Sequence, residues 1–182
     1  ANVILEGKEN VLNNYEIKVR PLDKKENFVK RCVALPGDTL TIVDTKVYID
    51  GKPQKDYQGI MFKYHVVTDG SSINPKALDR LEITSKDFEQ AGPQDYLIDL
   101  TNKKAADIKN FPNIKTVEKW ISKKGEADRF NLIFPRDSIN FKWNNDNFGP
   151  LVIPKKGMKI KLTKENIILY RRVIDVYDYN NY

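Results

Sequence analysis

Residues 27–35, NFVKRCVAL, combine apolar residues with two cations, Lys30 and Arg31, and we interpret them as a half-buried β-strand, in which successive side chains point to opposite faces. Lys30 shares one face of this predicted strand with Phe28, Cys32 and Ala34, and Arg31 shares the other with Val29, Val33 and Leu35. The pattern therefore places an amine between an aromatic ring and a thiol, on a face that proteins usually pack.

A turn and a hairpin follow this strand. Pro36-Gly37-Asp38 predicts a tight turn, because proline presets φ and glycine accepts a positive φ. In residues 39–53, two runs rich in β-branched and aromatic residues are separated by Asp44-Thr45 and closed by Asp50-Gly51. The three runs together predict a β-meander.

The rest of the chain mixes short strands with short helices. We expect helices over 83–93, capped by Thr84 or Ser85, over 101–112, capped by Thr101, and over 163–177, capped by Thr163. Strands are expected over 116–122, 130–134, 151–153 and 158–162, the last with Met158, Ile160 and Leu162 facing inward. The predicted fold class is mainly β, with a few short α-helices.

Length and composition bound the fold. A chain of 182 residues fits one domain, or one domain and a piece of another, and the single cysteine, Cys32, excludes an internal disulfide. The sequence contains no signal peptide and no run near the roughly 20 apolar residues that span a bilayer. We therefore expect a soluble chain, whose membrane anchor, if it has one, lies outside these residues.

A formal net charge of +6 suits an anionic partner. The cations recur as pairs along the chain with acids between them, however, and no block of five or six like charges occurs. No aromatic and basic signature of an RNA-binding strand is present either. The pattern predicts solvated surface and no nucleic-acid partner.

Several kinds of catalytic site are excluded or disfavoured. The glycines form no phosphate-binding loop, and one histidine and one cysteine cannot build a common zinc site, so we expect no cofactor and no metal. We interpret His65 as a strand residue and not as a catalytic base, because no nearby serine or cysteine stands in a nucleophile motif. We interpret Ser71-Ser72 as part of a turn that lacks the motif of a catalytic serine.

Lys30 remains as a candidate catalytic residue. A lysine acts as a general base only when it is neutral, and burial among apolar groups lowers its pKa toward that state. Ser-Lys hydrolases use such an amine to accept the proton of the serine. The alternative is a structural lysine whose stem lies on the sheet while its ammonium reaches water.

The segment NFVKRCVALPGD, followed by TLTIVDTKVYIDGKP, resembles the lysine-bearing block of the type I signal peptidases, the membrane-anchored Ser-Lys proteases that remove signal peptides from exported preproteins. In that family, a strand with Lys-Arg and small apolar residues leads into Pro-Gly-Asp and then a hairpin. PLDKKENFVKRCVALPGD and WNNDNFGPLVIPKKG are further similar to the long signal peptidases of the Bacteroidetes type.

The resemblance implies roles for five residues. Lys30 takes the place of the general base, and Arg31, Pro36, Gly37 and Asp38 take the places of residues that support it. The Ser-Met-x-Pro segment of the nucleophile has no counterpart, since Met61 and Met158 follow Ile60 and Gly157. The later blocks of the family, Gly-Asp-Asn-Arg and Ser-x-Asp-Ser-Arg, are missing too.

We therefore expect an interior fragment, inactive alone, with residues 1–38 as a remnant of the catalytic core and 39–182 as a non-catalytic insertion. The resemblance implies secretory preproteins as substrates. It also implies that the whole enzyme lies in the bacterial inner membrane, with this part in the periplasm.

Two other interpretations stay open. A β-rich extracytoplasmic module could bind an anionic membrane surface or a partner protein. A cytoplasmic Ser-Lys regulator that cleaves itself shares the dyad chemistry, although the long sequence after Pro-Gly-Asp argues against it.

Overall fold

A computed structural model of the 182-residue chain describes residues 7–16, 18, 21, 30–128 and 132–177. The chain divides into two compact units, residues 1–33 and 34–182. In the first unit, the short helix α2 (Lys8–Asn14) buries Val11 and leaves Leu12 exposed. The second unit contains all the strands described below.

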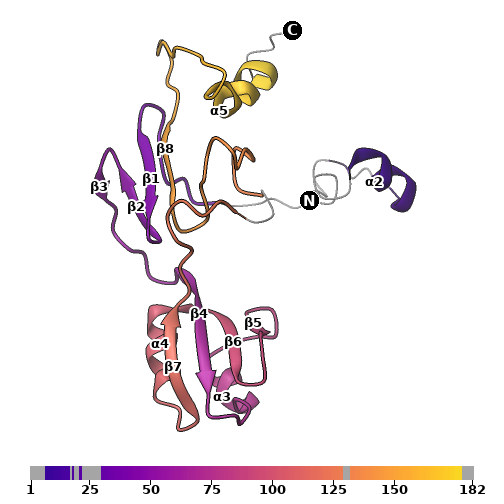
Figure 1. Cartoon of the computed structure of the whole chain (residues 1–182), viewed down its shortest axis with the longest axis vertical. Coiled ribbons are helices and arrows are strands. Elements are labelled where there is room, and N and C mark those ends of the chain that lie inside the picture. Colours follow the sequence, from indigo (N-terminus) through magenta and orange to yellow (C-terminus); the bar gives the residue numbers. More distant parts are fainter. Residues whose placement is uncertain (1–6, 17, 19–20, 22–29, 129–131, 178–182) are drawn as a thin grey trace. The chain divides into compact units, whose positions relative to one another are not determined.

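The first sheet contains the predicted hairpin. Its strands are β1 (Thr39–Val43), β2 (Lys46–Ile49), β3 (Lys52–Pro53) and β8 (Phe148–Val152), in the order β3-β2-β1-β8 (Figure 1). Asp44 and Thr45 both have positive φ, 46° and 72°, as a two-residue turn between antiparallel strands requires. The same holds at Asp50 and Gly51, with φ of 50° and 74°. The predicted hairpin over 39–53 is therefore confirmed, whereas the first run of the predicted meander is not, because residues 30–35 form no strand.

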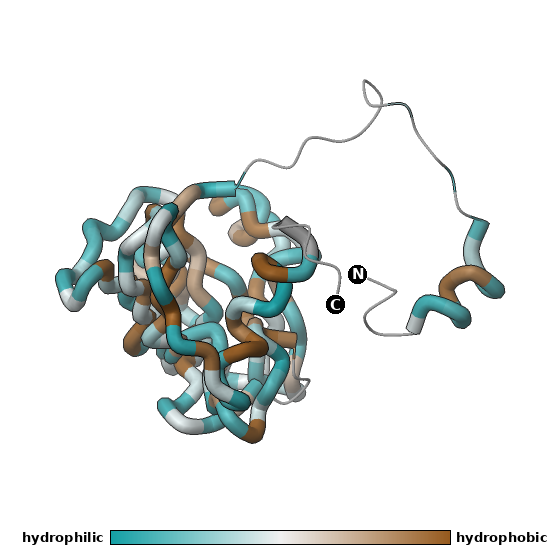
Figure 2. The backbone as a smooth tube through the Cα atoms, turned by 90° about the horizontal axis from the view of Figure 1, so that it is seen from above, coloured by the Kyte–Doolittle hydropathy of each residue, from teal (hydrophilic) through white to brown (hydrophobic). Residues whose placement is uncertain are grey.

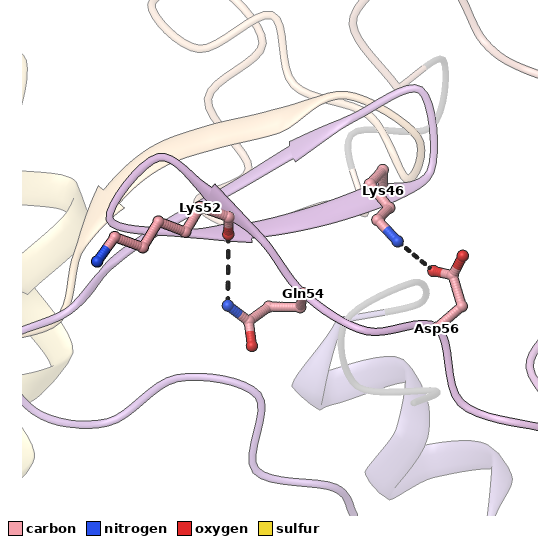
Figure 3. Close-up of polar contacts among 4 residues, drawn as sticks. All are labelled: Lys46, Lys52, Gln54 and Asp56. Atoms are coloured by element: carbon pink, nitrogen blue, oxygen red, sulfur yellow. Dashed lines mark hydrogen bonds and ion pairs between the residues drawn. The ribbon is translucent and has the colours of Figure 1, made fainter.

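The chain leaves β3 along a segment that is attached to the hairpin. The backbone N–H of Gln54 donates to the carbonyl of Val47 at 2.8 Å, and its side-chain amide donates to the carbonyl of Lys52 at 3.3 Å. Lys46 Nζ lies 2.8 Å from Asp56 Oδ1 (Figure 3). These contacts fix the direction in which the chain leaves the first sheet.

The second sheet holds the hydrophobic core. Its strands are β4 (Met61–Thr68), β5 (Phe88–Gln90), β6 (Asp95–Thr101) and β7 (Ile114–Lys119), in the order β5-β6-β4-β7. Burial alternates strictly along β4 and β6, so that one face of the sheet is packed and the other is partly exposed. Val66, Ile98 and Leu100 are 0% exposed on the packed face.

Two short helices lie beside this sheet (Figure 1). Helix α4 (Asn102–Lys109) contributes Ala105 and Ile108 to the core, and the Thr101 hydroxyl accepts from Lys104 N at 3.2 Å, which confirms the predicted N-cap. Helix α3 (Pro75–Arg80) is capped by Asn74, and the sequence pattern missed it.

The predicted helix over 83–93 is wrong. The Asp87 carboxylate accepts from Thr84 N at 2.9 Å and from the Thr84 hydroxyl at 2.7 Å, which closes a turn instead of starting a helix. Residues 88–90 then form β5, and the Phe88 ring stacks on Tyr96 with centroids 5.3 Å apart. Pairing with β6 prevails over a weak local helix signal, because it adds a ladder and an aromatic contact.

The predicted strand over 158–162 is also wrong. These residues belong to no sheet of the described chain, and Met158 and Leu162 are exposed rather than facing inward. The strand predicted over 130–134 lies partly outside the described residues, and 132–134 form none. Residues 151 and 152 belong to β8, and 116–119 belong to β7, as expected.

The C-terminal helix begins later than predicted. Helix α5 spans Ile167–Arg172 and continues into a π-helical segment, η2 (Val173–Tyr177). Thr163 precedes it in a turn, and its carbonyl accepts from Ile167 N at 3.0 Å.

The described residues confirm a β-rich fold with two antiparallel sheets and a few short helices. Hydrophilic and hydrophobic stretches are interspersed along the backbone (Figure 2). None of the helices described is long and apolar enough to cross a bilayer.

Candidate active site

The Pro-Gly-Asp sequence forms the predicted turn. Asp38 N donates to the carbonyl of Leu35 at 3.0 Å, and the Asp38 carboxylate accepts from Leu35 N at 2.7 Å. Proline at the second position and glycine with φ of 102° at the third match a type II turn. The aspartate therefore stabilises the turn through both its backbone and its side chain.

The turn is attached to Ile153, the residue that follows strand β8 much later in the sequence. Gly37 N donates to the carbonyl of Ile153 at 2.8 Å, and Ile153 N donates to the carbonyl of Asp38 at 2.8 Å. A Cβ on Gly37 would lie 2.9 Å from Lys155 Cδ. Glycine therefore suits this position for two reasons. It adopts the positive φ without strain, and it leaves room for the aliphatic part of the Lys155 side chain.

Lys30 and Arg31 lie on the N-terminal side of this turn. Both are exposed, as is Cys32, and Ala34 is half-buried. Residues 30–35 form no strand, so this part of the predicted strand is wrong, and Phe28 lies outside the described residues. A predicted strand acquires a buried face only when it joins a sheet, and residues 30–35 belong to none. The expected desolvation of Lys30 by Cys32 is accordingly absent from this structure.

Residues 144–147, within the WNNDNFG sequence, form a hydrogen-bonded network that sequence reasoning did not foresee. The buried Asn144 amide donates to the carbonyls of Lys123 and Glu126, at 2.9 and 2.7 Å, and its oxygen accepts from Asn147 N at 2.7 Å. The buried Asn147 amide donates to the carbonyl of Ser122 at 2.9 Å and accepts from Asp44 N at 3.2 Å.

This network joins the β1–β2 turn to residues 122–126 and to the start of β8. Asp146 adds two bonds, since its carboxylate accepts from Ser122 N at 2.8 Å and its carbonyl accepts from Thr45 N at 2.9 Å. The signal in the sequence was three asparagines and an aspartate between aromatic residues, a composition that suits side chains capping loop backbone.

His65 is a strand residue, as expected. It lies on β4, where its Nε2 is 2.9 Å from Asp95 Oδ1 and its ring meets Trp120 edge-on at 5.9 Å between centroids. Ser71 lies in a turn and its hydroxyl donates to Asp69. The structure brings neither residue to the Pro-Gly-Asp turn.

Two surface clefts lie elsewhere in the second unit. One, of about 500 Å³, is lined by residues 56–60, Phe62 and 101–103. The other, of about 490 Å³, lies beside the Lys63–Asp99 ion pair and Trp120. None of the five predicted site residues lines either cleft.

The comparisons with known proteins agree with the predicted resemblance. Residues 7–121 match the family model described as signal peptidase, peptidase S26, and this range contains Lys30, Arg31 and the turn at 36–38. Neither a curated protein nor a solved structure matches the chain. Because the matched range covers more than half of the 182 residues, the chain belongs to the S26 signal peptidase family.

Proposed function

We propose that Lys30 is the general base of a Ser-Lys signal peptidase whose nucleophilic serine is not among these 182 residues. The family acts in the processing of secretory preproteins and is associated with membranes. The observation that carries the proposal is the match over 7–121, which contains the Lys-Arg pair and, a few residues later in the sequence, a Pro-Gly-Asp turn that is held by hydrogen bonds.

The chemistry requires an amine that can change its charge. The serine hydroxyl attacks the scissile carbonyl while its proton moves to Lys30 Nζ, and the ammonium then protonates the departing amine. Water hydrolyses the acyl ester, again with Lys30 accepting a proton and returning it to the serine. Arginine cannot serve, because its guanidinium stays charged.

Exposure of Lys30 in this chain is compatible with that role. The serine-bearing segment and the bound preprotein cover the amine in the complete enzyme and supply the desolvation that the predicted strand does not. Arg31 and residues 36–38 are then positioning residues. The division into a catalytic remnant, 1–38, and a non-catalytic insertion, 39–182, is part of the same proposal.

The test compares two forms of the protein. The 182-residue chain alone is expected to leave a signal-peptide substrate uncleaved. In the protein that also carries the serine segment, Lys30→Ala and Lys30→Arg are each expected to lower processing by about 10²–10⁴-fold or more, with the fold retained because Lys30 is exposed. The matched control is Lys124→Ala, another exposed lysine, which should process normally.

Two results would contradict the proposal. Cleavage by the 182-residue chain that Lys30→Ala abolishes would show that a nucleophile lies within it. Normal processing by the Lys30→Ala variant of the longer protein would show that Lys30 is not the general base.

A further inference from the structure

The excess positive charge of the chain is confined to one segment. Of the 31 Lys and Arg residues, seven lie within residues 155–172, against one of the 25 acids, Glu165. The remaining 24 cations and 24 acids cancel. We call residues 155–172 the basic segment; its cations are Lys155, Lys156, Lys159, Lys161, Lys164, Arg171 and Arg172.

All seven cations are exposed. Arg171 forms an ion pair with Asp175, Nε to Oδ2 at 3.0 Å, and within the described residues the other six form none. Their charges are thus not neutralised inside the described part of the fold. A segment of this kind creates a local positive potential that attracts an anionic surface.

Apolar side chains project between these cations. Met158, Leu162 and Ile167 are 39%, 44% and 45% exposed. Two of them belong to the segment that the alternating pattern placed in a sheet, and they stay outside because no strand pairs there. Lysines flanking exposed aliphatic side chains suit the interface of a bilayer, where the aliphatic groups enter the acyl boundary and the ammonium groups reach the headgroups.

The basic segment is attached to the fold at both ends. At its start, the Lys155 stem lies across Gly37, next to the paired bonds between Ile153 and the turn at 36–38. At its end, Tyr170 is buried, and its hydroxyl lies 3.5 Å from the carbonyl of Val152 on β8. Between them, Asn166 caps the connecting turn by accepting from Thr163 N at 2.7 Å and donating to the carbonyl of Lys161 at 3.0 Å. The cations are therefore displayed by an ordered loop and helix.

We infer that the basic segment docks this protein on an anionic phospholipid surface, with the lysines on the headgroups and Met158, Leu162 and Ile167 in the interface. Nucleic acid fits less well, because single strands are bound by stacking on exposed aromatic rings and the one aromatic residue of the segment, Tyr170, is buried. The inference does not depend on the proposed peptidase mechanism. It would hold the Pro-Gly-Asp turn beside the membrane, since Lys155 contacts Gly37.

Vesicle co-sedimentation of the 182-residue chain tests the inference. The chain should bind vesicles of phosphatidylcholine with phosphatidylglycerol, bind vesicles of phosphatidylcholine alone at least about tenfold more weakly, and be released by salt. A variant with four substitutions, Lys156→Gln, Lys159→Gln, Lys161→Gln and Lys164→Gln, should lose binding by about tenfold or more. Lys155 is left in place because it packs on Gly37.

The matched control removes the same charge elsewhere. Lys52→Gln, Lys55→Gln, Lys76→Gln and Lys86→Gln replace four exposed lysines outside the basic segment. This variant should keep most of the binding, and far-UV circular dichroism should show that both variants are folded. Equal loss in the two variants would overturn the inference, because net charge and not the segment would then determine binding.

Two further binding experiments test whether the apolar side chains insert into the bilayer and whether the partner is a membrane or a nucleic acid. Met158→Gln with Leu162→Gln should weaken binding to the anionic vesicles by several-fold, and unchanged binding would overturn the insertion of these side chains. Tighter binding of a homopolymeric RNA than of the anionic vesicles at the same salt concentration, lost in the four-lysine variant, would assign the segment to nucleic acid instead. A chain that does not bind the anionic vesicles at all would also overturn the inference of membrane docking.

Discussion

Gly37 and Ile153 are joined by a backbone hydrogen bond of 2.8 Å, although most of the chain separates them in sequence. Ile153 returns a second bond of 2.8 Å to Asp38, so the Pro-Gly-Asp turn is held by the residue that follows β8. Two backbone hydrogen bonds therefore join the Pro-Gly-Asp turn to the segment that follows β8.

Gly37→Ala should destabilise the second unit by about 1–3 kcal/mol, because alanine is strained at a φ of 102°. The steric part should be small, since the atom it meets is on the flexible Lys155 side chain. Urea unfolding of Gly37→Ala with and without Lys155→Ala separates the two causes. If Lys155→Ala restores the full stability, the close contact and not the backbone conformation is the cause.

Asn147→Ala should cost about 1–3 kcal/mol, because it leaves Asp44 N and the Ser122 carbonyl without their buried partner. Asn147→Asp should not rescue it, since the Asn147 amide nitrogen lies 3.3 Å from Asp44 Oδ1 and a carboxylate there would face another. The exposed Asn145→Ala is the control, and its thermal midpoint should match that of the unmodified chain. Equal midpoints for Asn147→Ala and Asn145→Ala would contradict the network's role.

Ile98→Ala should destabilise the second sheet by about 2–5 kcal/mol, because the side chain is 0% exposed between the sheet and its helices. Leu97→Ala, at the neighbouring position on the half-exposed face of β6, should cost clearly less. Denaturant unfolding of both variants measures the difference. Similar losses would mean that the face carrying Leu97 is also packed.

Acidification should weaken the fold partly through Asp87. The backbone N–H of Thr84, and then its hydroxyl, hold the pKa of Asp87 below its usual value of 3.8. The folded state therefore releases this proton more easily than the unfolded state, and the stabilisation is present above about pH 4 and is lost as the pH falls through the lower, folded-state pKa.

The carboxyl carbon-13 shift of Asp87, followed by NMR, measures that pKa. Thr84→Val removes the hydroxyl donor and should move the pKa part of the way back toward 3.8. Thr84→Ser keeps the donor and should leave it low. A pKa unchanged in Thr84→Val would show that the hydroxyl bond does not contribute.

Local sequence indicated the positions of three turns and of the Thr101 cap of helix α4. Asp44, Asp50-Gly51 and Pro36-Gly37 have residue types that suit a positive or a preset φ. Thr45 is β-branched and holds its φ of 72° in a turn, where its N–H is bonded to the distant Asp146 carbonyl. The Thr101 cap depends on one turn of chain. The Lys-Arg and Pro-Gly-Asp motifs likewise indicated the family that the match over 7–121 shows.

The tertiary structure decided which alternating segments became strands. The sequence predicts strands over 27–35 and 158–162, yet residues 30–35 and 158–162 belong to no sheet of the described chain, whereas residues 88–90 pair with β6 although their sequence favours a helix. A strand exists only where a partner completes its hydrogen-bond ladder, and periodicity contains no information about the partner. For the same reason, only the folded chain shows that Lys30 is exposed here, and that the cations of the basic segment lie on a loop and a helix attached to the fold near Gly37 and at Tyr170.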